Sequence, residues 1–374
     1  MNLLVDCHVF DGKFQGTRTY IQGLYQSLIK YKDIDFYFAA QDVDNLKKYF
    51  GHNSTIHYIS LKTGSSIKRL AIEFPKIVKE YKIDFAHYQY ISPLAKCCKE
   101  IVTVHDLLFL DYPQYFSWSY KLKNEFLFKR SAKRADILLT VSEYSKEAIS
   151  RIFKISRDKI FLTPNAVLPV DNNIVVPNVR EKFGLDKFIL TVSRIEPRKN
   201  HLMLLKAFND LNLAAKGYKL VMVGVPDLKY KEFSDYYDTL EPLVKDAVIV
   251  KPVPFPDLVG LYQQASLFVF PSFAEGFGIP PLEALEYGCP ILCSHATAMA
   301  EFQFPKEWTF DPYDEEELKQ KMSFLLQHRP NLKEEKELLK KKYNWDVIAD
   351  GFYQEIKSKF DECMLKKQID KIEI

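Results

Sequence analysis

The sequence lacks the long apolar runs and the cysteine patterns that mark membrane-spanning, zinc-binding or disulfide-rich proteins. No apolar run approaches the ~18 residues that a membrane-spanning helix requires. The six cysteines form no CxxC pair and no Cys/His zinc spacing, and the adjacent Cys97 and Cys98 suit buried thiols better than disulfides. The apolar run before Asp6 is too short for a signal peptide. We therefore expect a cytoplasmic protein with reduced thiols, whose membrane contact can only be peripheral.

A strong charge of one sign is also absent. Lysine and arginine number 52 and aspartate and glutamate 49, so the net charge of +3 is too small to indicate nucleic-acid binding. Hydrophobic residues at 47% and charged residues at 27% are typical of a globular protein. At roughly 100–200 residues per domain, a chain of 374 residues is expected to form two domains.

Short apolar runs alternate with amphipathic helical segments, which predicts parallel sheets with crossover helices. The expected strands are 3–5, 36–40, 101–104 and 137–141 in the first half, and 188–193, 220–223, 248–250, 267–270 and 291–293 in the second. Because the pattern occurs twice, we predict an α/β protein with two Rossmann-like domains facing across a cleft. Ligands of such sheets bind at the carboxyl ends of the strands.

The boundary between the domains is expected at 168–178, where the sequence LPVDNNIVVPN has two prolines, three asparagines and no periodicity. The predicted first domain is 1–168 and the second is 179–350. A C-terminal helical segment, 351–374, is expected to pack back on the first domain.

The segment after the run 267–270 carries the most information. Its sequence PSFAEGFGIPPLEALEYGCP places Glu275 and Glu283 eight residues apart, around two glycines and a proline pair. The glycines allow close backbone approach, and the prolines suit the first turn of a helix, whose N-terminus attracts anions. Spacing alone does not distinguish a functional anion-binding loop from a glutamate that only complements a helix dipole.

The string EGFGIPPLEA resembles the EGFGLPxLEA signature of retaining glycosyltransferase family 4, which has the GT-B fold. The resemblance implies that Glu283 holds the ribose hydroxyls of a donor nucleotide and that Glu275 lies beside the donor sugar. It also implies a backbone surface that faces the sugar and diphosphate, made by Gly276, Phe277, Gly278 and Ile279.

The string SRIEPRKNH, 193–201, follows another predicted strand. A lone Arg-Lys pair is usually a solvated turn, but the whole string resembles the family's GxxEPRKN segment. The resemblance implies that Arg198 and Lys199 neutralise the donor phosphates and stabilise the leaving nucleotide. Ser193 stands where many relatives have glycine, and Asn200 is placed to cap the following helix.

Three further positions match other segments of the family, the one at Gly16 loosely. His105, in VTVHDLLFLDYP, follows the run 101–104, and the resemblance implies contact with the donor sugar near the reacting carbon. Gly16 resembles the N-terminal glycine loop that meets donor phosphate and acceptor, although an ordinary strand-to-helix turn is the alternative. Val253 falls where relatives contact the base through backbone atoms. The resemblance covers about residues 3–355.

The resemblance implies sugar transfer with retention at the anomeric carbon, from a nucleotide sugar bound to the second domain to an acceptor bound to the first. Arg198 and Lys199 would relieve the charge of the leaving diphosphate. No DxD motif lies where a metal would be held, so we expect a metal-independent reaction without a cofactor. GDP-mannose is the expected donor because the EPRKN and HD strings look closest to mannosyltransferase-like group 1 members. A UDP-sugar is the alternative.

Other classes of protein share parts of this pattern. A glycosidase would also use two carboxylates, but the glycine loop and the cations favour a phosphate leaving group. An epimerase or a phosphorylase would share the fold. A phosphorylase would need a lysine that holds pyridoxal, and nothing in the sequence singles one out. A non-catalytic nucleotide-sugar-binding protein stays open as an alternative.

The segment 118–134, WSYKLKNEFLFKRSAKR, interleaves aromatics with six cations and one acid. Such a helix suits the anionic inner leaflet of the cell membrane, but long cations that extend past apolar neighbours in a core helix would have the same composition. The expected acceptor is a saccharide or a lipid-linked saccharide in surface polysaccharide assembly, such as lipopolysaccharide.

Overall fold

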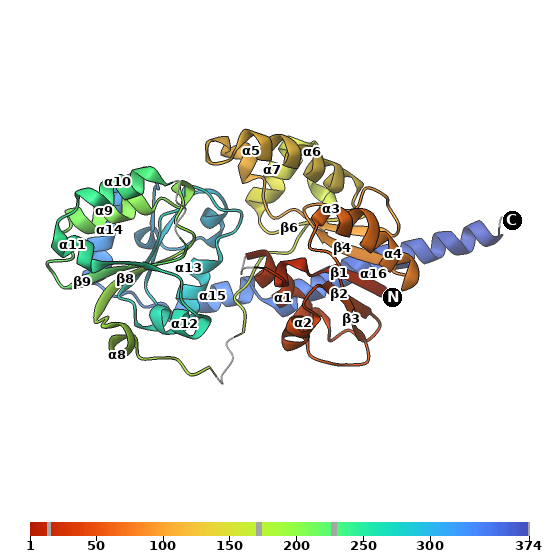
Figure 1. Cartoon of the computed structure of the whole chain (residues 1–374), viewed down its shortest axis with the longest axis horizontal. Helices are drawn as coiled ribbons and strands as arrows, with labels where there is room; N and C mark the ends of the chain where they lie inside the picture. Colours follow the sequence, from red (N-terminus) through yellow and green to blue (C-terminus); the bar gives the residue numbers. More distant parts are fainter. Residues whose placement is uncertain (13–15, 170–173, 226–229, 373–374) are drawn as a thin grey trace. The chain divides into compact units, whose positions relative to one another are not determined.

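The computed structural model describes residues 1–12, 16–169, 174–225 and 230–372, and the side chains through 365. The chain forms two compact units (Figure 1). The first comprises Met1–Leu168 and Tyr343–Ile374, and the second Pro169–Lys342. The C-terminal helix that joins the first unit begins at Trp345, within the range 179–350 that the sequence assigned to the second domain.

The first unit is built on a seven-stranded sheet of order β3-β2-β1-β4-β5-β6-β7, in which every strand pair is parallel. Its strands are β1 (Asn2–Asp6), β2 (Asp35–Ala40), β3 (Ile56–Ser60), β4 (Phe85–Gln89), β5 (Lys99–Thr103), β6 (Ile137–Thr140) and β7 (Ile160–Leu162). Its α-helices are α1 (Gly16–Leu28), α2 (Val43–Phe50), α3 (Ser66–Lys68), α4 (Phe74–Glu80), α5 (Leu108–Asp111), α6 (Trp118–Arg134), α7 (Glu143–Phe153) and α16 (Trp345–Ile372).

The second unit has a six-stranded parallel sheet of order β10-β9-β8-β11-β12-β13. Its strands are β8 (Lys187–Val192), β9 (Tyr218–Val223), β10 (Val248–Lys251), β11 (Leu267–Phe270), β12 (Ile291–Ser294) and β13 (Thr309–Phe310). Its α-helices are α8 (Val179–Phe183), α9 (His201–Asp210), α10 (Lys231–Thr239), α11 (Pro242–Ala247), α12 (Phe255–Gln264), α13 (Ile279–Glu286), α14 (Glu315–Gln327) and α15 (Lys333–Lys342).

The predicted class, two parallel-sheet Rossmann-like domains, is confirmed. All nine apolar runs predicted as strands fall on strands, and most of their residues are buried because helices cover these sheets. Strands β3, β4, β7 and β13 were not predicted. The most consequential of these is β4, which is buried throughout but contains His87 and Gln89 among its apolar residues.

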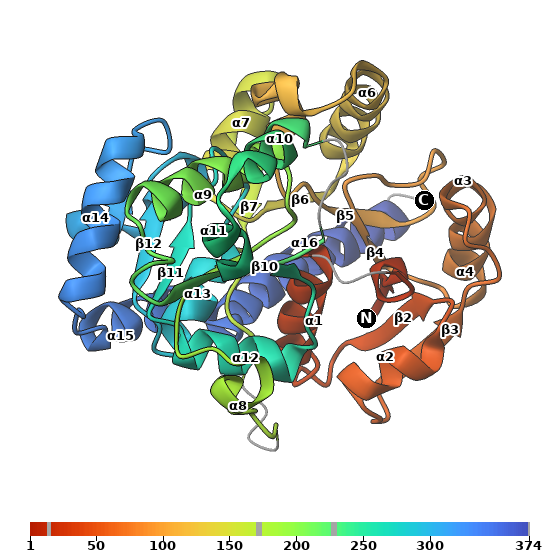
Figure 2. The ribbon, with the colours of Figure 1, turned by 60° about the vertical axis from the view of Figure 1, so that its left-hand side comes forward.

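Helix α16 completes the first unit by packing along α1 (Figure 2). Gly23 makes this contact possible, since a Cβ atom there would lie 2.1 Å from the ring of Trp345. Farther along, the rings of Tyr31 and Tyr353 stack with centroids 3.6 Å apart, and the Tyr31 hydroxyl donates to Asp350 at 2.6 Å. Small and aromatic residues therefore fix the position of α16 on α1.

Candidate active site

The loop after β11 and the turn after β8 are joined in the second unit. Arg198 and Lys199 lie in a short 3-10 turn, η5 (Pro197–Lys199). The Arg198 carbonyl accepts from the amide of Phe273 at 2.9 Å, and Arg198 Nη1 donates to the Ala274 carbonyl at 2.6 Å. These bonds hold the two loops together at the carboxyl ends of adjacent strands, where ligands of parallel sheets bind.

Glu275 is the centre of the charges in this region. Its carboxylate accepts from Lys199 Nζ at 2.5 Å and from Arg198 Nη1 at 3.2 Å. Arg198 also donates to Glu196 at 2.8 Å. The side chains of Lys199, Arg198 and Glu275 are only 13%, 14% and 10% exposed. The structure thus brings together three of the predicted catalytic residues, with two cations balanced by two carboxylates.

The pKa values follow from this arrangement. Burial by itself would raise the pKa of Glu275, but the charges of Lys199 and Arg198 outweigh burial and lower it. Burial lowers the pKa of Lys199, because the desolvated ammonium beside Arg198 is stabilised only in part by Glu275. Glu275 is therefore a carboxylate held by cations, which makes it a weak base and a strong electrostatic partner.

The backbone of Glu275 is fixed by Thr297, a residue that the sequence reading missed. The Glu275 amide donates to Thr297 Oγ1 at 2.9 Å, and that hydroxyl donates to the Glu275 carbonyl at 3.1 Å. Thr297 has φ 53°, in the left-handed region that β-branched residues rarely adopt. A strained residue that clamps a charged site residue is a common feature of functional sites.

The glycine loop leads into α13 as the sequence predicts. Gly278 has φ 95°, and a Cβ atom there would lie 3.2 Å from Met299, so this position requires glycine. Pro280 and Pro281 follow Ile279 in the first turn of α13 and have no amide hydrogen. Any anion at this helix start would therefore depend on amides that precede the prolines, including those of Gly278 and Ile279.

Glu283 lies farther along α13, and its contacts are separate from the Glu275 cluster. Its carboxylate accepts from the Tyr262 hydroxyl of α12 at 2.9 Å. Burial raises the pKa of Glu283, and the Tyr262 hydrogen bond opposes that shift. Tyr262 is a second residue that the sequence reading missed.

The remaining predicted donor-site residues of this unit have other neighbours. The hydroxyl of Ser193 lies 3.1 Å from His201 Nε2, and the Ser193 carbonyl would lie 1.9 Å from a Cβ at Gly224. Val253 is half-buried between β10 and α12. The prediction that Asn200 caps α9 is wrong. Asn200 occupies the cap position with φ 56°, but its side chain donates to the Pro312 carbonyl at 3.0 Å instead.

In the first unit, His105 is buried just beyond β5, and its Nε2 lies 2.7 Å from Gln89 Oε1. The Tyr20 ring meets it edge-on at 4.9 Å between centroids, and the Tyr90 ring lies at 5.2 Å. Burial lowers the pKa of His105 to about 3, so the ring is neutral at physiological pH. Gly16 is the exposed first residue of α1, while Lys13, Phe14 and Gln15 of the same predicted loop lie outside the described residues.

Two Asp-x-Asp pairs of the first unit have structural partners. Asp33 accepts from the Tyr353 hydroxyl at 2.7 Å, and Asp35 lies 3.5 Å from His57. Asp42 caps α2, and Asp44 pairs with Lys47 at 2.8 Å. In the parts of the chain that the structure describes, no three His, Cys, Asp or Glu side chains gather as a metal site would require.

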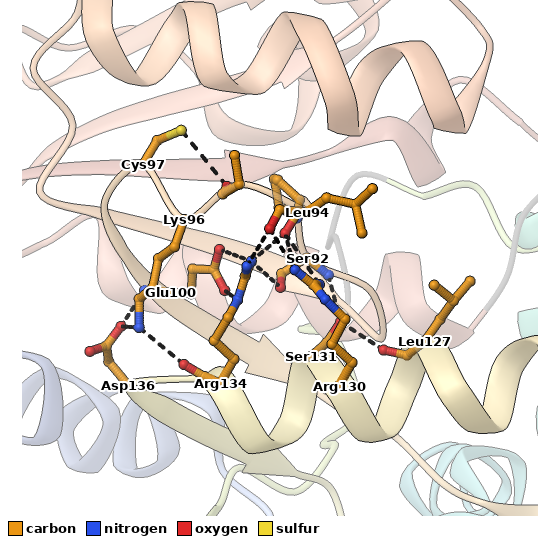
Figure 3. A network of polar contacts seen from close by, with 12 residues as sticks. Ser92, Leu94, Lys96, Cys97, Glu100, Leu127, Arg130, Ser131, Arg134 and Asp136 are labelled. Atoms are coloured by element: carbon orange, nitrogen blue, oxygen red, sulfur yellow. Dashed lines mark hydrogen bonds and ion pairs between the residues drawn. The ribbon is translucent and has the colours of Figure 1, made fainter.

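Arg130 and Arg134 of helix α6 have partners inside the first unit (Figure 3). Arg130 Nη2 donates to the Leu94 carbonyl at 2.6 Å, and Arg134 Nη2 pairs with Glu100 at 2.6 Å. Trp118 and Phe126, in contrast, are 71% and 69% exposed. Across the described residues, no helix is both long enough and apolar enough to cross a bilayer.

Two protein-family models match this chain, one in each of its two sheet-forming parts. Residues 14–169 match the model described as glycosyltransferase family 4, and residues 176–345 match the model described as glycosyl transferases group 1. The chain belongs to glycosyltransferase family 4. The predicted family is thereby confirmed, and the GT-B fold class with it, because the two matches follow one another along most of the chain.

Similar proteins include two bacterial O-antigen enzymes. O-antigen chain mannosyltransferase B of Escherichia coli is 32% identical over 58% of this chain and 58% of its own length. O-antigen chain mannosyltransferase RfbU of Salmonella typhimurium is 30% identical over 52% of each. The matches therefore span little more than half of these relatives.

Among solved structures, sucrose-phosphate synthase from Thermosynechococcus elongatus matches with a TM-score of 0.73 at 18% identity, covering 96% of this chain and 99% of that one. Anabaena HepE, in complex with UDP and glucose, matches with a TM-score of 0.72 at 16% identity, covering 96% and 100%. At these identities the likeness shows the fold.

Proposed function

We propose that this family 4 glycosyltransferase transfers a hexose, with retention of anomeric configuration and without a metal, from a nucleotide sugar to a saccharide or a lipid-linked saccharide. The cluster of Arg198, Lys199 and Glu275 is the observation that carries the proposal. It supplies two buried cations at the strand edge where a leaving diphosphate would bind, and preorganised charge is the main source of stabilisation for such a leaving group.

Each residue of the site has its own proposed role. Arg198 and Lys199 stabilise the charge on the departing diphosphate, and the amides around Gly276–Ile279 contribute hydrogen bonds. Glu275 orients the sugar and keeps the two cations in place. Its lowered pKa favours this role over that of a general base. Glu283 accepts hydrogen bonds from the ribose, His105 contacts the sugar, and Gly16, Ser193 and Val253 line the nucleotide sugar.

GDP-mannose is the proposed donor. The two bacterial relatives named as O-antigen mannosyltransferases support it. A UDP-sugar is the alternative donor, and the HepE complexes with UDP and UDP-glucose are of that type. Surface polysaccharide assembly at the inner face of the cell membrane is the proposed setting.

Peripheral contact with an anionic membrane through α6 is part of the proposal. The exposed Trp118, Leu122 and Phe126 follow at four-residue intervals and so lie along one side of the helix. Near the end of α6, a pocket of about 870 Å³ is lined by Lys133, Lys146, Lys154, Lys159 and Lys359 together with Asp136, Asp158 and Glu355. Lysines outnumber acidic residues there, which favours binding to an anionic membrane surface.

The test is nucleotide release from a panel of GDP- and UDP-sugars by the purified protein, with and without saccharide acceptors. Release from one donor, lost in Glu275→Ala and Lys199→Ala but kept in the exposed controls Lys333→Ala and Glu334→Ala, would support the proposal. The anomeric configuration of the product, read by NMR, and activity in a metal chelator test retention and metal independence. GDP or UDP binding in thermal-shift titration without any release would favour a non-catalytic binding protein.

A further inference from the structure

A continuous chain of buried hydrogen bonds leads from His105 into the core of the first unit. Gln89 bridges two histidines, with Oε1 2.7 Å from His105 Nε2 and Nε2 3.2 Å from His87 Nε2. His87 Nε2 also lies 2.7 Å from Thr103 Oγ1, and His87 Nδ1 lies 2.6 Å from the Tyr25 hydroxyl. Every member of the chain is buried. Polar groups in such a place hold one defined arrangement, because an unmatched donor or acceptor there is costly.

The bond between Gln89 and His105 decides which ring nitrogen of His105 carries the proton. An amide oxygen can only accept, so Nε2 of His105 must be the protonated nitrogen. The ring is neutral, which leaves Nδ1 without a proton. No hydrogen bond within the described residues uses this Nδ1 atom, so it is the acceptor that His105 can offer to a ligand.

The far side of Gln89 couples the orientation of its amide to the tautomer of His87. Gln89 Nε2 and Thr103 Oγ1 lie 3.2 and 2.7 Å from His87 Nε2. In this orientation the NH2 group can only donate, so His87 Nε2 bears no proton. Burial lowers the pKa of His87 to about 3, so its single proton resides on Nδ1 and is donated to Tyr25. Reversing the amide would require both histidines to exchange tautomers together.

We propose that Gln89 is a positioning residue that sets the tautomer of His105, with His87 as the residue that fixes the Gln89 amide. His105 then acts toward a bound sugar as a neutral acceptor at Nδ1, and it takes a hydrogen bond from a sugar hydroxyl. This consequence rests on the proposed function, whereas the tautomer itself is a property of the protein alone. The rings of Tyr20 and Tyr90 keep the imidazole plane fixed so that Nδ1 points in one direction.

The test is a long-range ¹H–¹⁵N correlation spectrum of the full chain labelled at its eight histidines, which distinguishes protonated from unprotonated ring nitrogens. His105→Asn and His87→Asn variants assign the two rings. We expect proton-bearing Nε2 in His105 and proton-bearing Nδ1 in His87. Proton-bearing Nδ1 in His105, or a charged ring at neutral pH, would overturn the proposal whether or not the protein transfers sugar.

Two substitutions test the role of Gln89 itself. In Gln89→Glu a carboxylate accepts from both sides, so His87 should switch to proton-bearing Nε2 while His105 stays unchanged. Gln89→Met, of similar length but without an amide, should let a second His105 tautomer appear. If neither spectrum differs from that of the native protein, Gln89 does not set the tautomer.

Signals from the exposed His52 and His328 report whether each variant is folded, and Gln114→Met is the matched control on the same unit. With an active donor, Gln89→Met should lower kcat/KM by about 2–10-fold, the effect of weakening one hydrogen bond, while Gln114→Met leaves it unchanged. Loss of activity in all proteins together with the expected spectra would contradict the proposed function and leave the tautomer assignment standing.

Discussion

Lys199 and Glu275, 76 residues apart in the sequence, form a buried ion pair whose nitrogen and oxygen atoms lie 2.5 Å apart. Arg198 contacts the same carboxylate, so the two cations depend on Glu275 more than it depends on either of them. Removing Glu275 should therefore lower the free energy of unfolding more than removing Lys199.

Glu275→Ala should lower the free energy of unfolding of the second unit by about 3–5 kcal/mol, because Lys199 loses its carboxylate partner and stays buried beside Arg198, which keeps only Glu196. Lys199→Ala should cost less, since Arg198 still compensates Glu275. Chemical denaturation of both variants and of Lys199→Ala/Glu275→Ala gives the coupling energy, expected at about 1–3 kcal/mol. Equal losses for the two single variants with no coupling would contradict this reading.

Three buried histidines should make stability depend on pH. Burial lowers the folded-state pKa of His87, His105 and His201 to about 3, from 6.5. Below pH 6.5 the unfolded chain binds protons that the folded protein does not, so stability is full above this pH and falls as the pH drops toward 3. Each histidine contributes up to about 1.4 kcal/mol per pH unit.

Urea denaturation between pH 7.5 and 4.5 measures this slope. His87 and His105 act on the first unit and His201 on the second. A His105→Gln variant should therefore show a slope lower by about one proton for the first unit only. A slope unaltered by that substitution would mean that the folded ring takes up its proton near 6.5.

Thr297 should contribute to stability mainly through the hydrogen bonds of its hydroxyl group. Thr297→Ala removes both bonds to the Glu275 backbone and keeps the left-handed conformation, at a cost of about 1–2 kcal/mol. Thr297→Gly also loses the bonds but relieves the strain at φ 53°, so it should be the more stable of the two. Thr297→Ser should retain both turnover and stability. Thermal unfolding and nucleotide release would rank the variants. Native stability and turnover in Thr297→Ala would show that the Thr297 hydroxyl does not hold the Glu275 backbone.

Gly23→Ala should destabilise the first unit although alanine favours helices by about 1 kcal/mol. The new methyl group would meet the Trp345 ring at 2.1 Å, and overpacking typically costs about 1–3 kcal/mol. In a Trp118→Phe/Trp308→Phe background only Trp345 remains of the three tryptophans, so its emission reports whether α16 moves. Gly12→Ala is the control, because among the described residues, its chain neighbours aside, no atom lies within 4 Å of a Cβ at that position. A gain in stability from Gly23→Ala would mean that the contact is loose.

Membrane binding through α6 should depend on apolar and cationic side chains for which the described part of the chain shows no polar partner. Trp118→Ser/Phe126→Ser and Lys129→Glu/Lys133→Glu should each reduce co-sedimentation with anionic vesicles. The charge reversal is expected to weaken it at least about 30-fold, since losing each lysine alone costs about 1 kcal/mol. Leu243→Ser/Leu338→Ser removes exposed apolar residues of the second unit as a control. Binding that ignores vesicle charge and both α6 variants would exclude this surface.

The sequence was most informative where a contiguous string defines the local structure. The segment from Glu275 to Glu283 has its turn, its left-handed glycine and its helix start within one run of residues, so all three could be predicted. Strand β4 was missed because His87 and Gln89 interrupt its apolar pattern. Of these two polar residues, Gln89 contacts His105 and His87 contacts Gln89.

Contacts between distant loops had no sequence signal. Thr297 meets Glu275 only because the loops after β11 and β12 come together in space. For the segment 118–134 the sequence left a membrane-facing surface and a core helix with extended cations as alternatives, and backbone carbonyls of Pro93 and Leu94 accept from Arg130 and Arg134. Periodicity assigns a residue to one side of a helix, but the partner is a loop whose course only the fold determines.

The first unit is assembled from two stretches of chain that are synthesised far apart in time. The 174 residues of Pro169–Lys342 are translated between them, which takes roughly 10–35 s at about 5–20 residues per second. During that interval the surface of α1 around Gly23 has no α16 to cover it, while the second unit, being contiguous, can fold as it leaves the ribosome. A chaperone that acts on the nascent chain would therefore meet an incomplete first unit together with a complete second one, and a ribosome that stalls within the codons of α16 would leave the first unit unfinished although its strands had been made before the second unit.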